Sequence, residues 1–295
     1  MSDTSARTAS PEAPTGQSAG PSPAEQLAAQ REAAKQRIAN RAAAKKQAEA
    51  GKPESRFESH GPGRRRSAAE LKYIADEAAV ALADASAEDV ALWAHEQFGE
   101  AMIVACSMAG DTVLPHLIAQ YSPGVDVLFL NTGYHFAETI GTRDALEAAV
   151  DVNIIDALPE LSVAEQDAEY GEKLYARNPT LCCKMRKVEP INRELAGYEA
   201  WVTGIRREDN AFRSHAQLVE WDETHQMVKL NPLAAWSFDD MTRYASEHQV
   251  PVNLLLTEGY PSIGCEPCTK PVAPGEDPRS GRWAGVAKTE CGIHL

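Results

Sequence analysis

The chain has 295 residues, with 29 Lys and Arg against 43 Asp and Glu, and a formal net charge of −14 at pH 7. An acidic chain repels the phosphate backbone, so we expect no nucleic-acid partner. No run of eighteen apolar residues occurs, and the N-terminus lacks the apolar stretch of a secretory signal, so we expect a soluble cytoplasmic protein with no membrane partner.

The first 67 residues differ in composition from the rest. They are rich in Ala, Gln, Pro, Ser and Gly, and they carry 12 Lys and Arg against 7 Asp and Glu. Because this segment holds almost no large apolar residue, it cannot bury a core. We predict a disordered low-complexity extension over 1–67 and a single domain over 68–295, which includes a mobile C-terminal catalytic tail over 275–295.

The body begins with alternating strand and helix patterns. Three short apolar runs rich in β-branched residues predict strands, at 101–106, 125–130 and 151–155. Helical patterns separate them, at about 112–121 and 135–149. This alternation is typical of a parallel sheet whose connections are helices.

A second group of elements completes the predicted domain. A helix is expected from about 181 to 196, followed by a strand at 200–203. Weaker extended runs predict a hairpin, at 217–221 and 226–230, and Ser237 is expected to cap a helix that reaches His248. We therefore predict a doubly wound α/β fold with a mostly parallel sheet and a ligand site at the carboxyl ends of its strands.

Two predicted strands end in small or polar residues. The first runs into Ser107-Met-Ala-Gly110-Asp111, where backbone N–H groups and a helix dipole attract anions. A strand-to-helix turn needs small residues in any case, so this loop alone does not distinguish a phosphate site from an ordinary turn. The second strand ends in Asn131-Thr132-Gly133. We expect both segments to bind a nucleotide, through Ser107, Gly110, Asp111, Asn131, Thr132 and Gly133.

The basic residues of the acidic body are concentrated. Nine of the 17 Lys and Arg in 68–295 lie in three short segments: Lys184, Arg186 and Lys187; Arg206, Arg207 and Arg213; and Arg279, Arg282 and Lys288. Such grouping predicts a site for a small anion. Two loop histidines, His135 and His215, are expected to be solvated or capping residues.

Six cysteines form an informative pattern: Cys182 and Cys183 are adjacent, Cys265 and Cys268 form a C-x-x-C, and Cys106 and Cys291 stand alone. In a reducing compartment, clustered cysteines indicate metal binding or catalysis. The first four could hold a [4Fe–4S] cluster or a tetrahedral zinc ion. Adjacent helical residues point about 100° apart, which suits a large cluster better than one compact ion.

Cys291 is the predicted nucleophile. Lys288 and His294 flank it at i−3 and i+3, where cationic groups would favour the reactive thiolate. Only four residues follow Cys291, so its segment is expected to move. Cys106 lies inside a predicted strand and is expected to be an inert core residue.

Several of these segments resemble a known family. Ser107-x-x-x-Asp111 has the spacing of the pyrophosphate loop of adenine-nucleotide α-hydrolase-like proteins, and Asn131-Thr-Gly resembles the Asp-Thr-Gly of the sulfonucleotide reductases. Three more stretches are similar to that family, namely 182–190, 204–209 and 277–294. The match covers roughly 90–295. The sequence departs from the pattern at Met108 and Ala109, which replace glycines of ATP-splitting relatives, and at Asn131, which replaces the usual Asp.

The resemblance implies a function and a set of roles. Family members specific for adenosine 5′-phosphosulfate (APS) carry this cysteine set on a [4Fe–4S] cluster, whereas relatives that use the 3′-phosphorylated substrate (PAPS) usually lack it. It implies that Cys291 attacks the sulfur of APS, that AMP leaves, and that thioredoxin or a similar dithiol releases sulfite from an S-sulfocysteine, as in sulfate assimilation. Lys187 would link cluster and substrate, and cations would surround the substrate, namely Arg206, Arg207, Arg279 and Arg282.

Three alternatives remain at this stage. A PAPS reductase differs only in its preferred nucleotide. An iron–sulfur RNA-thiolating ATP pyrophosphatase would share the fold, but the acidic body and the absent Gly-Gly in the first loop count against it. A noncatalytic cluster-binding or zinc-binding module would leave Cys291 without a role. The sequence also leaves a homo-oligomer open.

Overall fold

The computed structural model describes residues 65–283 and 292–293. The chain divides into two units, Met1–Pro53 and Glu54–Leu295, and every described residue belongs to the second. Residues 1–64 of the predicted N-terminal extension lie outside the described residues. So do 284–291 and 294–295 of the predicted catalytic tail, which include Lys288, Cys291 and His294.

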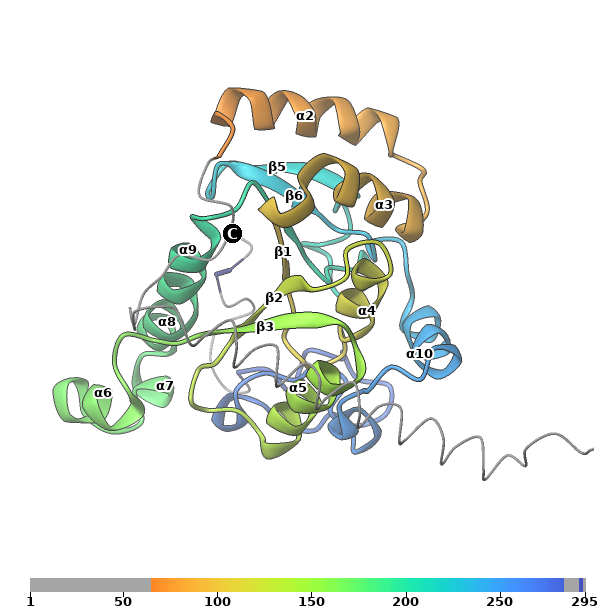
Figure 1. Ribbon diagram of the computed structural model, residues 1–295. Helices are drawn as coiled ribbons and strands as arrows, with labels where there is room; N and C mark the ends of the chain where they lie inside the picture. Colours follow the sequence, from red (N-terminus) through yellow and green to blue (C-terminus); the bar gives the residue numbers. More distant parts are fainter. Residues whose placement is uncertain (1–64, 284–291, 294–295) are drawn as a thin grey trace, which may run out of the picture. The chain divides into compact units, whose positions relative to one another are not determined.

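The described residues form a six-stranded sheet in the order β3-β2-β1-β4-β6-β5 (Figure 1). The strands are β1 (Met102–Ala105), β2 (Val125–Leu130), β3 (Val152–Ala157), β4 (Ala200–Val202), β5 (Val219–Asp222) and β6 (Met227–Leu230). All neighbouring pairs are parallel except β5 with β6, which form the predicted antiparallel hairpin. The predicted α/β class with a mostly parallel sheet is thus confirmed. The chain winds outward from β1 to β3 and returns to β4 beside β1, which creates a topological switch point there.

Helices connect the strands and cover the sheet. They are α2 (Ala68–Ala81), α3 (Ala87–Phe98), α4 (Val113–Ala119), α5 (Ala137–Ala149), α6 (Val163–Tyr170), α7 (Leu174–Arg177), α8 (Pro179–Cys183), α9 (Glu189–Leu195) and α10 (Phe238–Glu247). Short turns of 3-10 helix occur at η1 (Gly99–Ala101), η3 (Leu254–Thr257) and η4 (Glu266–Cys268). Ser237 forms a capping box with Asp240, as its place before an apolar pattern predicts. No helix among the described residues is both long and apolar enough to cross a bilayer.

Side-chain alternation along the strands creates two packed layers. Met102 and Val104 face a core shared with α2, α3 and α4, whereas Ile103 between them packs with Ile191 and Leu195 of α9. Figure 1 shows α9 on one side of β1 and β2, with α3 and α4 on the other. Because both faces are covered, the central strands read as continuous apolar runs.

The helix predicted over 181–196 is not continuous. Between α8 and α9, residues Lys184–Val188 form one turn of π-helix, η2. Pro190, in the first turn of α9, has no N–H for the preceding turn, so regular i→i−4 bonding cannot run through this point. Turns of this kind widen a helix locally and are frequent at functional sites. This one carries Lys184, Arg186 and Lys187 directly after the adjacent cysteines.

Candidate functional site

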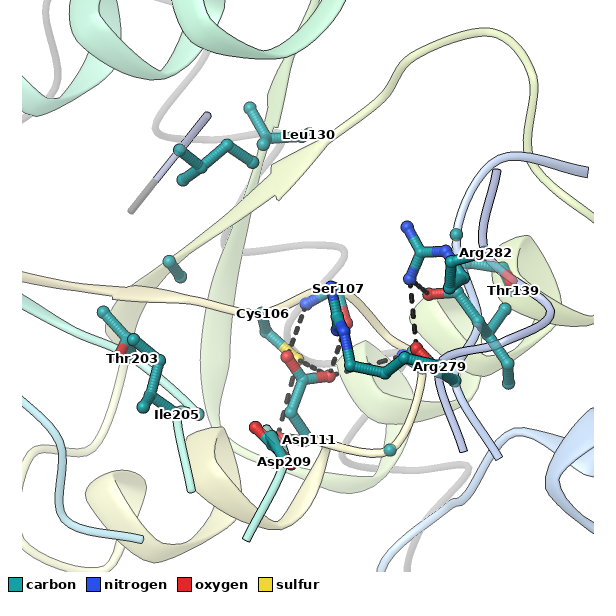
Figure 2. Close-up of a pocket in the computed structure, with 18 of the residues that line it drawn as sticks. Cys106, Ser107, Asp111, Leu130, Thr139, Thr203, Ile205, Asp209, Arg279 and Arg282 are labelled. Carbon is teal, nitrogen blue, oxygen red and sulfur yellow. Dashed lines mark hydrogen bonds between the residues drawn. The ribbon is translucent and has the colours of Figure 1, made fainter. Parts of the chain in front are cut away.

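A cavity lies at the carboxyl edge of the sheet, at the switch point beside β1. It encloses about 500 Å³ and is lined by the segments that follow β1, β2 and β4, by parts of 256–265 and 278–283, and by Ile293. Figure 2 shows Arg279 and Arg282 on one side of this cavity and Thr203 and Ile205 across from them. Its size and position are those expected of a small-molecule site in a doubly wound fold.

The loop after β1 forms hydrogen bonds with the side chain of one of its own residues, Asp111. Asp111 accepts hydrogen bonds from the Ser107 backbone N at 2.8 Å, the Ser107 hydroxyl at 3.0 Å and the Ala109 backbone N at 3.3 Å (Figure 2). Ser107, Gly110 and Asp111 all line the cavity, as the sequence predicted. Two backbone N–H groups of the loop, those of Ser107 and Ala109, are therefore engaged by Asp111.

Asn253 holds this loop in place, and the sequence analysis missed it. Its fully buried carboxamide donates to the Met108 carbonyl at 3.0 Å and to the Thr139 hydroxyl at 3.1 Å, and it accepts from the Leu255 backbone N. Met108 adopts a φ of 57°, a left-handed conformation that is unfavourable for a residue with a side chain. A polar residue between Val252 and Leu254 was the available signal, but its partners are too distant in sequence to be inferred.

The segment after β2 contributes only part of what was predicted. Thr132 lines the cavity, and its hydroxyl lies 3.3 Å from the Cys265 sulfur. Among the described residues, the cavity wall includes neither Asn131 nor Gly133. Asn131 instead donates to Asp156 at 3.4 Å, and a Cβ on Gly133 would meet the Arg186 guanidinium at 3.2 Å.

Of the two adjacent arginines predicted to bind the substrate, only one lines the cavity. Arg206 lines the cavity and bonds to Glu208 and to Asp209, the latter at 2.9 Å, and Asp209 also pairs with Arg213 at 2.9 Å. Arg207 points elsewhere, since its Nε donates to the Ala216 carbonyl, and it does not appear in the described cavity wall. Adjacent residues in a turn direct their side chains apart, so only one of the pair reaches the cavity.

Arg279 and Arg282 approach from the C-terminal segment and both line the cavity. Arg282 donates to the Ser262 hydroxyl at 3.2 Å and to the Ile263 carbonyl at 3.0 Å. Its guanidinium carbon also lies 4.7 Å from the ring centroid of Trp283, which is 4% exposed. The Trp283 backbone N donates to the Cys268 carbonyl, so this segment joins the cavity to the C-x-x-C turn.

A second, smaller cavity brings together all four predicted metal ligands, namely Cys182, Cys183, Cys265 and Cys268. Burial, and then the neighbouring thiols, raise the pKa of Cys182 to about 12. The pKa of Cys268 rises to about 11 for the same reasons. Thiolates that destabilise one another would be stabilised by a cation among them, because a bound metal ion displaces the thiol protons.

The donor set fits a metal centre in number and chemistry. Four thiols and no nitrogen or oxygen ligand suit an iron–sulfur cluster, and they also suit zinc. No three His, Cys, Asp or Glu side chains within the described ranges are arranged to hold a single metal ion. The assignment of a metal centre therefore rests on the presence of four thiols in one cavity.

The two cavities have a common wall, formed by Lys187, Cys265, Arg282 and Trp283. Lys187 projects from the π-helical turn that follows Cys183. A cation on this wall is placed to act on an anion in the larger cavity and on thiolates in the smaller one. Lys187, predicted to link cluster and substrate, thus lines both cavities, and its role stays a prediction.

Two further residues of the larger cavity have perturbed pKa values. Burial, followed by the nearby Asp111 carboxylate, raises the pKa of Cys106 well above that of a free thiol. Cys106 is therefore a poor nucleophile. His135 is not the solvated loop residue that was expected: it lines the cavity, its Nε2 lies 2.9 Å from the Leu130 carbonyl, and burial lowers its pKa.

The described part of the C-terminal segment reaches the same cavity. Ile293 lines it and packs against the hydrophobic cluster that includes Ile103 of β1 and Leu128 of β2. A Cβ on Gly292 would lie 3.7 Å from the Val188 side chain, at the end of the π-helical turn. Cys291, the predicted nucleophile, immediately precedes these two residues and is outside the described part of the chain.

Comparisons with known proteins agree with this architecture. Residues 101–271 match the family described as the phosphoadenosine phosphosulfate reductase domain. The adenosine 5′-phosphosulfate reductase of Mycolicibacterium smegmatis is 54% identical over 226 residues, which cover 77% of this chain and 95% of that protein. The enzyme of the same name from Streptomyces coelicolor is 54% identical over 229 residues, covering 78% of this chain and 97% of the relative.

A solved structure has a similar fold. The crystal structure of phosphoadenylyl-sulfate (PAPS) reductase from Candida auris, a phosphate complex, superposes with a TM-score of 0.58. Its sequence identity is 29%, and the match covers 67% of this chain and 96% of that one. The resemblance found in the sequence is thus confirmed by sequence and structure together.

Proposed function

This chain belongs to the phosphoadenosine phosphosulfate reductase family, a family of sulfur-group oxidoreductases, and we propose that its substrate is adenosine 5′-phosphosulfate, which it reduces to sulfite and AMP. The observation that carries the proposal is the common wall between a cavity of nucleotide size and a four-thiol site. The relatives that are more than 50% identical over most of their length carry the name of this activity.

The four thiols are proposed to hold a [4Fe–4S] cluster. Cys182 and Cys183 would bind it from the end of α8, and Cys265 and Cys268 from the η4 turn. When bound, the cluster would supply a fixed charge beside the substrate cavity and would hold these two chain segments together. Arg186 and Lys187 lie nearby to offset negative charge, and zinc remains the alternative that metal analysis distinguishes.

Cys291 is proposed as the nucleophile. Its thiolate would attack the sulfur of the sulfonate, a new S–S bond would form, and the bond from that sulfur to the phosphate oxygen would break so that AMP leaves with the electron pair. Ile293 lines the cavity and follows Cys291 by two residues, which supports this proposal. Lys288 and His294 are proposed to favour the thiolate, as cationic neighbours do.

The cavity must reduce the repulsion between a thiolate and an anionic substrate. Lys187, Arg279 and Arg282 line it and are proposed to surround the phosphosulfate as charge moves to the leaving phosphate oxygen. Arg206 would contribute from the opposite wall. A dithiol reductant of the thioredoxin class would then attack Cys291, release sulfite and end as a disulfide, which returns the free thiol to the enzyme.

The test uses purified, iron-containing protein. With APS and no reductant, wild-type protein should release one equivalent of AMP and gain an SO₃ group, about 80 Da by composition, on the peptide that contains Cys291. Thioredoxin should remove the adduct and release sulfite. The Cys291→Ser protein should keep its iron and bind AMP but show no turnover. Mapping of the adduct to Cys106, or sulfite production by Cys291→Ser, would disprove this mechanism.

The Candida auris structure favours a second candidate substrate, PAPS, because that protein carries the name of a PAPS reductase. Its identity of 29% is well below the 54% of the relatives named for APS. Parallel kinetics on the two nucleotides decide between them. A kcat/KM higher for PAPS than for APS would replace the substrate while leaving the cofactor and nucleophile proposals in place.

A further inference from the structure

Two tyrosine rings border the four-thiol cavity. Tyr134 follows β2 and Tyr175 lies in α7, and both line this cavity together with Pro179. Their ring centroids are 5.3 Å apart and the ring planes meet at 75°, an edge-to-face contact of the favourable kind. Both residues are half-buried. Each ring therefore has a surface in solvent and another beside the thiols.

The inner and outer walls of this cavity consist of different residues. Lys187, Arg282 and Trp283 also line the larger cavity, so they separate thiols from substrate. Tyr134 and Tyr175 line the thiol cavity, but they are not among the described residues that line the larger cavity. Cys182 and Cys183 are both 7% exposed, whereas Cys265 and Cys268 are half-buried. The two tyrosines thus border the thiols on a side that the larger cavity does not share.

Tyr134 is held firmly from several directions. The Arg186 guanidinium carbon lies 5.2 Å from its ring centroid, and Gln166 donates to its hydroxyl at 3.4 Å. Its carbonyl accepts from the Glu266 backbone N at 2.8 Å, one residue from Cys265. Arg186 is itself 3% exposed and bonds to Gln166 at 2.9 Å. This ring is fixed to both cysteine segments, and it supports the edge of Tyr175.

We propose that Tyr134 and Tyr175 form a shield that limits the access of water and dioxygen to the metal site. The apolar surroundings of a metal centre control its solvent exposure and its reactivity. Tyr175 is the part of the shield that can be removed with the least disturbance, because Tyr134 also anchors the β2 loop. The proposal rests on the four-thiol cofactor site under the proposed function.

The first test follows the visible absorbance of the iron-loaded protein in air-saturated buffer without substrate. Tyr175→Ala should lose this absorbance about ten-fold faster than wild type, because residues around a metal site typically change its properties by ten-fold or more. Tyr175→Phe retains the ring and should bleach at the wild-type rate. Tyr73→Ala removes a tyrosine that is 66% exposed on α2, and it should also match wild type.

A second measurement does not require iron. Iodoacetamide labelling of metal-free protein, read by peptide mass spectrometry, should be faster at Cys182 and Cys183 in Tyr175→Ala than in wild type or Tyr175→Phe. If wild-type protein binds no iron, the cofactor proposal fails while labelling still tests the shield. Equal bleaching rates in Tyr175→Ala and wild type, or equal labelling rates where no iron is bound, would overturn the shield.

Discussion

Replacement of Gly264 by alanine displaces Arg282 without deleting its charge. A Cβ added at Gly264 would lie 2.5 Å from Cζ and 3.0 Å from Nε of Arg282. Separations this short are not tolerated between a Cβ and another heavy atom, so one of the two groups must move. The guanidinium is the end of a flexible side chain, whereas Gly264 is fixed in the backbone. We therefore expect the guanidinium to leave its position on the wall between the two cavities.

The size of the effect follows from the contacts that are lost. Arg282 donates to the Ser262 hydroxyl and the Ile263 carbonyl, and their loss should lower the free energy of unfolding by about 1 kcal/mol per bond. A charge-assisted contact to the substrate contributes about 1.5 to 3 kcal/mol. Its loss should raise KM for APS by about ten-fold to 100-fold.

The assay is steady-state sulfite release from APS, with iron content measured on each sample because Gly264 precedes Cys265. Gly141→Ala is the matched control, since no atom lies within 4 Å of a Cβ at that helical position. It should keep wild-type KM and raise the free energy of unfolding by about 0.5 to 1 kcal/mol, because Ala is favoured over Gly inside a helix. A Gly264→Ala protein with full iron and a KM within two-fold of wild type would refute the placement of Arg282 in the substrate site.

Two further predictions address the metal site and pH. Cys268→Ser removes one of the four thiols and should abolish the iron–sulfur absorbance and the activity together. The control, Cys106→Ser, should retain iron. Full iron and sulfide in Cys268→Ser would disprove the assignment of Cys268 as a ligand. Burial lowers the pKa of His135 below 6.5, so as pH falls through 6.5 the unfolded chain gains a proton that the folded chain resists, and stability decreases. Urea unfolding at pH 7.5 and pH 5.5 should show that the free energy of unfolding decreases less in His135→Gln than in wild type. Equal decreases in the two proteins would contradict a lowered pKa of His135.

The substrate cavity is not uniformly cationic. Asp111 and Asp209 line it together with the basic residues, and each makes several hydrogen bonds within the protein. Asp209 holds Arg206 and Arg213 in fixed directions, and Asp111 closes the loop after β1. The cations on the wall shared with the four-thiol cavity, Lys187 and Arg282, are therefore candidates to bind an anionic group.

Elements whose signals are local were predicted well from the sequence. The strand over 125–130 and the helix capped by Ser237 agree with the structure because apolar runs and capping residues act over a few neighbouring positions. The π-helical turn at 184–188 was not predicted, since it depends on the competition between regular bonding and Pro190. The two helices before β1, α2 and α3, were also not assigned from the sequence.

The sequence by itself determined the chemistry that the protein has available: two pairs of cysteines, three groups of cations and loops at strand ends. Only the tertiary structure decided which of these meet. It brought Cys182 and Cys183 to Cys265 and Cys268, placed Arg206 but not Arg207 on the cavity, and gave Asn253 its partners. Residue type fixes what a side chain can do, but packing between segments far apart in the chain fixes what it touches.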